Sequence, residues 1–133
     1  MKQRFLISVA VIFVMFMALG FFVHGFLLHR DYAQLPNLFR SEEDYLNHFQ
    51  YMLLGQFLAA VAFVWIYLRG KEDKPFLAQG VRYGLAIAAV MVIPKFMIYY
   101  SVQPIAGAIV FKQIIFDTLG VVLMGIVVAR LNR

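Results

Sequence analysis

The sequence predicts an all-α integral membrane protein, a four-helix bundle that runs up, down, up and down with both termini in the cytoplasm. Of its 133 residues, 63% are hydrophobic and 14% are charged, whereas soluble domains have about 45–50% apolar and about 25% charged residues. The apolar residues form four runs, at about 5–28, 45–68, 76–100 and 105–129. Each run exceeds the roughly 20 residues that cross a bilayer core. We therefore expect a single transmembrane domain over residues 1–133.

The first span follows the basic start Met1-Lys2-Gln3-Arg4. Its apolar run is longer than the ~7–15 residues of a signal-peptide core, which favours an uncleaved span. The connection 29–44 contains the turn signal Pro36-Asn37. Apolar residues interleave with charges in this connection, so we expect an ordered segment at the membrane interface.

The next boundaries carry helix start and stop signals. Ser41 can cap the second span, and the three acids that follow it suit the positive end of a helix dipole. In the charged turn 69–75, Gly70 suits a helix stop and Pro75 suits the start of the third span. Residues 101–104 form the turn before the fourth span.

Basic residues near the span ends predict the orientation. Seven of them (Lys2, Arg4, Arg69, Lys71, Lys74, Arg130 and Arg133) fall on the side that holds both termini. The positive-inside rule places that side in the cytoplasm of a multi-pass membrane protein. The formal net charge of +5 is explained by this flanking pattern, so nucleic acid is not an expected partner.

Small residues four apart mark two possible helix contacts. The third span carries Gly80, Gly84 and Ala88, and the second carries Gly55 and Ala59 in a similar face. Such spacing lets helices approach closely in lipid. The motif suits either an interface with a partner chain or packing within the bundle, and we favour packing within the bundle.

An intramembrane polar cluster is the first candidate site. Lys95 on the third span and Asp117 on the fourth lie at comparable depth, with Gln113 one turn from Asp117 and Lys112 directed toward the outer surface. Ionisable groups at this depth are costly and usually paired. We expect an ion pair between Lys95 and Asp117 that serves either as a relay or as a structural lock. Pro94 should disturb the helix beside the lysine.

Four further side chains are possible ligand-binding residues: His24, His48, Gln56 and Tyr99. Paired histidines on neighbouring helices can hold haem iron. We prefer to interpret His24 and His48 as interfacial residues near water, with no acid beside either one. No metal site and no cofactor are expected, and haem is a minor alternative.

The sequence offers little sign of an enzyme. It contains no cysteine, which excludes structural disulfides and thiolate chemistry. It also lacks a phosphate-binding loop, a metalloprotease motif and a recognisable pair of nucleophile and base. We expect a non-enzymatic protein.

The second half carries Gly80, Gly84, Pro94, Asp117 and Met124-Gly125, together with Tyr99 or Tyr100. In these features it resembles an uncharacterised bacterial family of small four-span membrane proteins, a domain of unknown function. The first span departs from that family, because residues 24–28 stand where the family has a Trp-Tyr pattern. The resemblance implies the four-span fold and a place in a bacterial inner membrane, and it implies no particular activity.

Three functions are open on this evidence. The first is a binding or accessory subunit that contacts membrane lipid, a partner membrane protein or further copies of itself. The second is a proton- or ion-coupled transporter of small solutes that acts as an oligomer. The third is a haem or quinone redox subunit.

Overall fold

The computed structural model describes all 133 residues, and every regular element is a helix. Along the chain these are α1 (Lys2–Gly20), the π-helical segment η1 (Phe21–Leu27), α2 (His29–Tyr32), α3 (Glu42–Gly70), α4 (Phe76–Ile87), the π-helical segment η2 (Ala88–Val92), α5 (Ile93–Val102) and α6 (Gly107–Leu131). Four continuous helical stretches, α1–η1, α3, α4–η2–α5 and α6, are long and apolar enough to cross a membrane. The predicted all-α class and the four apolar helices are confirmed.

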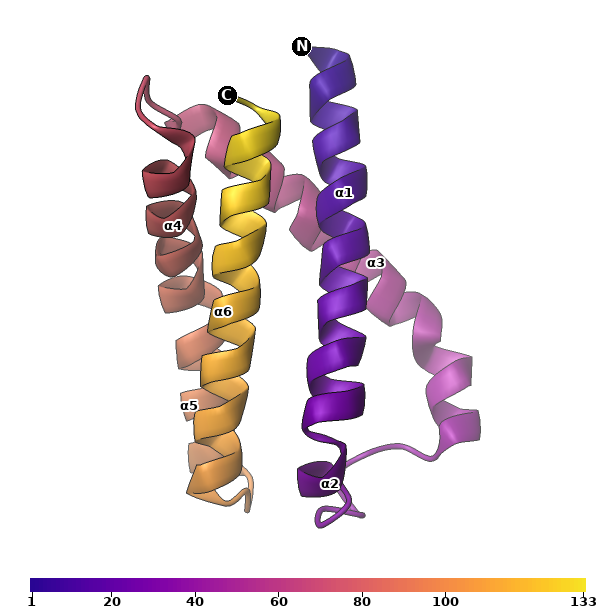
Figure 1. Cartoon of the computed structure of the whole chain (residues 1–133). Coiled ribbons are helices and arrows are strands. Elements are labelled where there is room, and N and C mark those ends of the chain that lie inside the picture. The colour runs from indigo at the N-terminus through magenta and orange to yellow at the C-terminus, as the bar shows by residue number, and fades with distance from the viewer.

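Helix α6 occupies the centre of the arrangement (Figure 1), where it contacts α1 on one side and α4 and α5 on the other. Helix α3 packs mainly on α1 and lies at a steep tilt to the other helices. Both chain termini lie at the same end of the molecule. The first half of α3, which begins at the opposite end, therefore diverges from the bundle.

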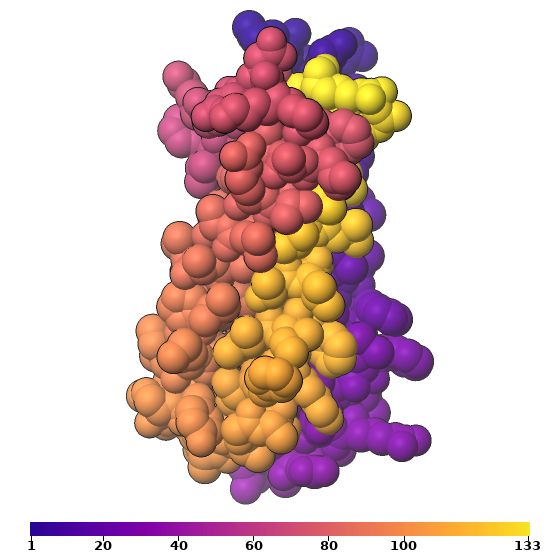
Figure 2. Space-filling model, turned by 60° about the vertical axis from the view of Figure 1, so that its left-hand side comes forward, coloured from indigo at the N-terminus to yellow at the C-terminus, as the bar shows by residue number.

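The contact between α4 and α6 depends on glycine. A Cβ on Gly80 would lie 2.6 Å from the Cα of Ile126, and a Cβ on Gly84 would lie 2.5 Å from the Cα of Val122. A Cβ on Gly125 would likewise meet the carbonyl oxygen of Gly80. The two backbones are therefore in direct contact, and Figure 2 shows the helices side by side along their length. The spaced glycines of the third span pack within the bundle, as we favoured.

Most apolar side chains lie outside the core. Only 24 of the 133 residues are buried, and the core cluster includes Ile12, Val64 and Val128. Large apolar side chains such as Phe26 and Val90 are 72% and 74% exposed. Exposed apolar surface of this extent would be unfavourable in water, but it matches contact with lipid.

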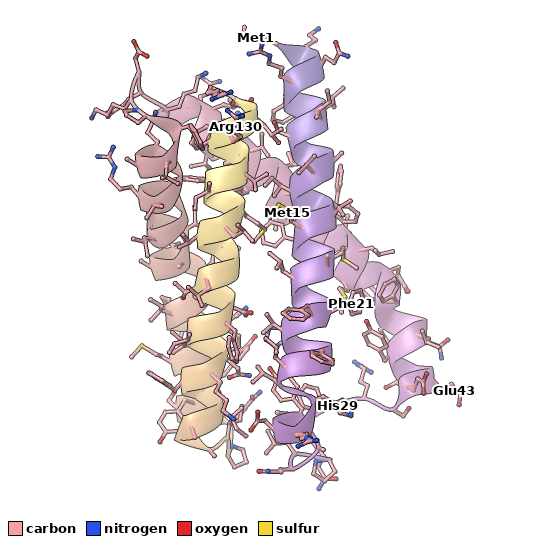
Figure 3. The ribbon with its side chains drawn as sticks, in the orientation of Figure 1. Met1, Met15, Phe21, His29, Glu43 and Arg130 are labelled. Carbon is pink, nitrogen blue, oxygen red and sulfur yellow. The ribbon has the colours of Figure 1, made fainter.

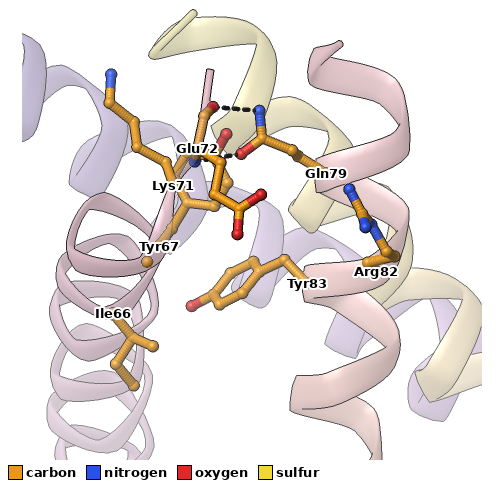
Figure 4. Close-up of a pocket in the computed structure, with 8 residues that line it drawn as sticks. Ile66, Tyr67, Lys71, Glu72, Gln79, Arg82 and Tyr83 are labelled. Carbon is orange, nitrogen blue, oxygen red and sulfur yellow. Dashed lines mark hydrogen bonds between the residues drawn. The ribbon is translucent and has the colours of Figure 1, made fainter. Parts of the chain in front are cut away.

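The start of α3 and the turn after it follow the sequence signals. The Oγ atom of Ser41 accepts a hydrogen bond from the backbone N–H of Asp44 at 3.2 Å, so the predicted cap is confirmed. In the following turn the Gln79 side chain accepts from the N–H of Glu72 and donates to its carbonyl oxygen, both at 2.7 Å (Figure 4). Gln79 also donates to the carbonyl oxygen of Lys74 at 2.7 Å. One side chain thus holds both sides of the turn.

Two π-helical segments interrupt otherwise regular spans. Segment η2 ends two residues before Pro94, which has no N–H to donate, so the predicted disturbance beside Pro94 is confirmed. Segment η1 contains His24 and Gly25 and has no proline. A π turn holds an extra residue, and it rotates the following side chains by about 100° around the axis. Such turns are frequent at functional sites.

Candidate functional site

The central feature of the site is a contact between His24 of η1 and Asp117 of α6. The Nε2 atom of His24 lies 3.0 Å from each carboxylate oxygen of Asp117. The side chains are 33% and 18% exposed, respectively. No other hydrogen bond to the Asp117 carboxylate is formed within the chain. His24 is therefore its sole protein partner.

The contact belongs to a longer chain of hydrogen bonds. The Nδ1 atom of His24 lies 2.5 Å from the hydroxyl oxygen of Tyr32, and that hydroxyl accepts from the Nε2 atom of Gln113 at 3.0 Å. With hydrogen on Nε2 of His24, the hydrogen bonds run in one direction. Gln113 donates to the Tyr32 hydroxyl, Tyr32 donates to Nδ1 of His24, and Nε2 of His24 donates to the Asp117 carboxylate. Two turns of α6 are thereby tied to η1 and α2.

Aromatic packing fixes the histidine ring. The rings of His24 and Tyr32 are stacked, with centroids 5.8 Å apart and an interplanar angle of 4°. The ring of Phe96 from α5 lies 6.2 Å from the His24 ring. Tyr32 lies in the connection outside the spans, and burial raises the pKa of its hydroxyl above its ordinary value. Tyr32 therefore stays protonated and able to donate through the neutral pH range.

The predicted ion pair between Lys95 and Asp117 does not form. No acidic group lies within ion-pair distance of Lys95, which is exposed, with its Nζ atom 4.4 Å from the ring centroid of Phe96. The π turn η2 lies between the start of the span and Lys95, and it rotates the lysine away from the direction that a regular helix would give it. Asp117 is paired with His24 instead, and a carboxylate oxygen of Asp44 lies 3.3 Å from Nδ1 of His48, so the expectation that no acid accompanies either histidine was also wrong.

Lys112 belongs to a second contact between α6 and the connection. Its Nζ atom lies 3.1 Å from the nearer carboxylate oxygen of Asp31. Tyr32 and Phe39 pack their rings 5.0 Å apart within the same connection. The connection thus packs against the bundle, and its order and its place at the membrane interface stay predictions. Of the predicted polar cluster, Asp117 and Gln113 share one network, Lys112 lies in the neighbouring ion pair, and Lys95 is in neither.

A cavity of about 440 Å³ adjoins this network on the side of α3. Its lining combines apolar, aromatic and polar side chains with two glycines: Met17, Gly20, Phe21, His24, Gly25, Tyr32, Phe39, Tyr45, Met52 and Gln56. The aromatic ring of Phe21 stacks on Phe49 of α3 and so bridges the two helices (Figure 3 shows Phe21 on its helix). The cavity lies where the tilted α3 diverges from α1. Its size and mainly apolar walls with few polar groups are typical of small-molecule sites.

Gln56 is the polar group of this cavity that is free to bind. Its amide makes no hydrogen bond in the chain, whereas both ring nitrogens of His24 are engaged. The Tyr45 hydroxyl contacts the sulfur of Met52 at 3.7 Å. The Tyr32 hydroxyl, which donates to His24 and accepts from Gln113, keeps one acceptor lone pair. A ligand would therefore meet one free donor and acceptor on Gln56 and a weak acceptor on Tyr32.

The other two possible ligand-binding residues lie outside the cavity lining. The Nδ1 atom of His48 donates to the carbonyl oxygen of Asp44 at 2.7 Å, one turn earlier in α3. Tyr99 is 43% exposed and packs edge-on against Phe96. His24 offers no free nitrogen to a haem iron while it binds Tyr32 and Asp117. Paired ligation by His24 and His48 therefore does not fit these residues.

Sequence reasoning missed the link between His24, Tyr32 and Asp117. These residues are separated along the chain by as many as 93 positions. The sequence carried one signal for this contact: Asp117 and His24 are an acidic and an imidazole side chain that both lie inside apolar runs. His24 faces Asp117 from the π-helical segment η1, and the local composition gives no sign of a π turn there.

No protein-family model, no curated protein and no solved structure matches this chain. The side chains of His, Cys, Asp and Glu form no group of three or more that could hold a metal ion. The cavity and the hydrogen-bond chain beside it are therefore the features from which a function can be inferred.

Proposed function

We propose that this chain is a non-enzymatic, multi-pass protein of a bacterial inner membrane that binds an amphiphilic molecule in the cavity between α1 and α3. It acts as a binding subunit, alone or with a partner membrane protein. Its spans run up, down, up and down, and its termini lie in the cytoplasm. We include in this proposal the resemblance of the second half to small four-span proteins of unknown function.

The membrane assignment is supported by the four apolar helices. The orientation is supported by the seven basic residues that gather where the two termini lie, as the positive-inside rule requires. In this orientation, the cavity opens in the outer half of the bilayer, because it lies toward the end of α1 away from the N-terminus.

The observation that carries the binding proposal is the composition of the cavity wall. An unpaired Gln56 amide faces apolar and aromatic side chains such as Phe21, Phe39 and Met52. The Gln56 side chain is half-buried and makes no hydrogen bond within the chain, so a ligand head group can both donate to it and accept from it. The apolar walls suit a hydrocarbon or ring body.

The geometry also restricts the chemistry of the ligand head. His24 and Asp117 bond to each other within the protein, and no lysine or arginine lines the cavity, so the cavity presents no free cation. A carboxylate or phosphate head would therefore find no counter-charge. We infer a neutral head group, such as a carbonyl, hydroxyl or amide, on an apolar body that enters from the bilayer.

Gly25 gives a direct test of this proposal. A Cβ at Gly25 meets no atom within 4 Å, and Gly25 lines the cavity. Gly55 has the same open surroundings but is outside the lining, so Gly25→Leu and Gly55→Leu form a matched pair. The protein is extracted into native nanodiscs, and the bound small molecules are analysed by mass spectrometry. We expect one amphiphile to be enriched in the wild type and in Gly55→Leu and lost in Gly25→Leu.

Equal enrichment of the same molecules in both variants would contradict the proposal, since a filled cavity cannot retain the ligand. Gln56→Leu provides a second test with little change in volume. We expect it to weaken retention by about five- to tenfold, the loss of one hydrogen bond of about 1 kcal/mol. Unchanged retention would show that Gln56 is not the contact.

Proton-coupled transport is the second candidate, and the hydrogen-bonded pair of His24 and Asp117 beside the cavity favours it. An imidazole that is hydrogen-bonded to a carboxylate within a span can pass a proton to and from that carboxylate. With the retained amphiphile in proteoliposomes, coupled movement of protons would disappear in Asp117→Asn while binding remains. Binding without any proton movement in the wild type would leave the first proposal standing alone.

A further inference from the structure

A second cavity lies at the end of the molecule that carries both termini. Its volume is about 540 Å³, and it is lined by residues of the start of α1, the end of α3 and the chain end. Three basic side chains, Lys2, Arg4 and Lys71, converge on it from two distant segments of the chain. Phe5, Leu6 and Leu68 form its apolar wall. We call this cavity the terminal groove.

The charges of the terminal groove are not neutralised within the protein. None of Lys2, Arg4 and Lys71 forms an ion pair, although four such pairs with lysine, arginine or histidine occur elsewhere near the helix ends. No acidic side chain lines the groove. The nearby Glu72 is engaged with Lys74, whose ammonium holds the pKa of that carboxyl below its ordinary value. The groove therefore presents uncompensated positive charge.

The floor of the terminal groove is fixed by buried polar contacts. Asn132 is 4% exposed and donates from its Nδ2 atom to the Oγ atom of the fully buried Ser8 at 2.9 Å. Lys71 donates to the carbonyl oxygen of Asn132 at 2.9 Å. These bonds join α1, the turn after α3 and the chain end. The basic groups are thus held around a preformed hollow rather than scattered on a flexible tail.

We propose that the terminal groove binds the head group of an anionic phospholipid. The combination of uncompensated basic side chains, an apolar wall and a position at the end of the spans fits a phosphodiester whose acyl chains continue along α1 and α3. Basic pockets between membrane helices bind anionic head groups by the same complementarity. This inference is independent of the ligand proposed for the cavity beside His24.

The test uses nanodiscs of phosphatidylcholine that contain a minor fraction of phosphatidylglycerol. Native mass spectrometry counts the phosphatidylglycerol molecules that stay bound after release from the nanodisc. We compare the triple variant K2Q/R4Q/K71Q with the control R69Q/R82Q/R130Q, which removes the same charge at the same end, leaves the groove lining unchanged and keeps Lys74 paired with Glu72. Each basic residue near a membrane surface contributes about fivefold in affinity for anionic lipid.

We expect retained phosphatidylglycerol to fall at least tenfold in the groove variant and to change little in the control. The charge-preserving variant K2R/R4K/K71R should retain the lipid, which separates loss of charge from loss of fold. An equal fall in both triple variants would show diffuse surface attraction and overturn the site. Retention in the groove variant would also overturn it. Displacement by soluble glycerol 3-phosphate would indicate a free phosphate ester as the ligand instead of a lipid.

Discussion

Replacing His24 with leucine should destabilise the fold far more than replacing Lys95 with methionine. In His24→Leu, the Asp117 carboxylate loses its sole hydrogen-bond donor in the protein, and the Tyr32 hydroxyl loses its acceptor. In Lys95→Met, the change removes an exposed ammonium whose recorded partner is the ring of Phe96. The two substitutions separate the pair that the structure contains from the pair that the sequence suggested.

The expected losses in the free energy of unfolding follow from how exposed the substituted side chains and their partners are. Breaking a fully buried ion pair costs about 3–5 kcal/mol, but His24 serves here as a hydrogen-bond donor and the Asp117 side chain is 18% exposed, so water replaces part of the lost contact. A hydrogen bond to a charged group contributes about 1.5–3 kcal/mol. We therefore expect His24→Leu to lower the free energy of unfolding by about 2–3 kcal/mol. Lys95→Met should cost less than about 1 kcal/mol, the size of an exposed cation–π contact.

The assay is unfolding in mixed micelles by titration with dodecyl sulfate, followed by far-ultraviolet circular dichroism. Asp117→Asn keeps an acceptor for the histidine and should cost about 1 kcal/mol. The double variant His24→Leu with Asp117→Leu removes both polar groups and should be more stable than His24→Leu alone. A larger loss in Lys95→Met than in His24→Leu would refute the assignment of the partner.

Three further predictions concern the bundle and its turns. Gly84→Ala should lower the free energy of unfolding by about 1–3 kcal/mol in the same assay, because its Cβ would meet the α6 backbone at 2.5 Å. Gly55→Ala, whose Cβ has open surroundings, should not lower the free energy of unfolding. Equal effects of the two substitutions would contradict the close contact of α4 with α6. Gln79→Leu should speed proteolysis of the turn after α3, because three hydrogen bonds are lost. An unchanged rate of cleavage would show that these hydrogen bonds do not hold the turn. Because the pKa of Tyr32 is raised in the folded protein, its contribution to stability is complete below pH 10.0, its ordinary pKa, and is lost as pH rises through the higher folded-state value. The free energy of unfolding of Tyr32→Phe should therefore fall less steeply with pH over that range than that of the wild type. Parallel pH profiles of the two proteins would contradict this contribution of Tyr32.

Much of the fold could be predicted from the sequence, because lipid imposes simple rules on length and composition. The four apolar runs needed only hydropathy, and the cap at Ser41 needed only one side chain and its neighbours. The packing of Gly80 and Gly84 within the bundle followed from their four-residue spacing, but that spacing did not name α6 as the partner. These features depend on local chemistry or on a regular helical repeat.

The partner of Asp117 could not be predicted, because it depends on a departure from the regular helical repeat. Reasoning from a regular repeat placed Lys95 opposite Asp117, but the π turn η2 changes the rotation of the helix before Lys95. A similar turn in η1 precedes the contact of His24 with α6. The cavity at Gln56 depends on the tilt of α3, a property of the whole assembly that single-span patterns do not contain.

Photocrosslinking at neighbouring phenylalanines tests the central claim most directly. Phe21 and Phe22 are 49% and 51% exposed, yet only Phe21 lines the cavity beside His24. A photoreactive phenylalanine analogue is placed at either position, and the adducts formed in native membranes are weighed by mass spectrometry. Our account predicts a single defined amphiphile adduct at position 21, above a background of bulk lipid adducts shared with position 22. The same distribution of adducts at both positions would contradict a specific ligand in this cavity.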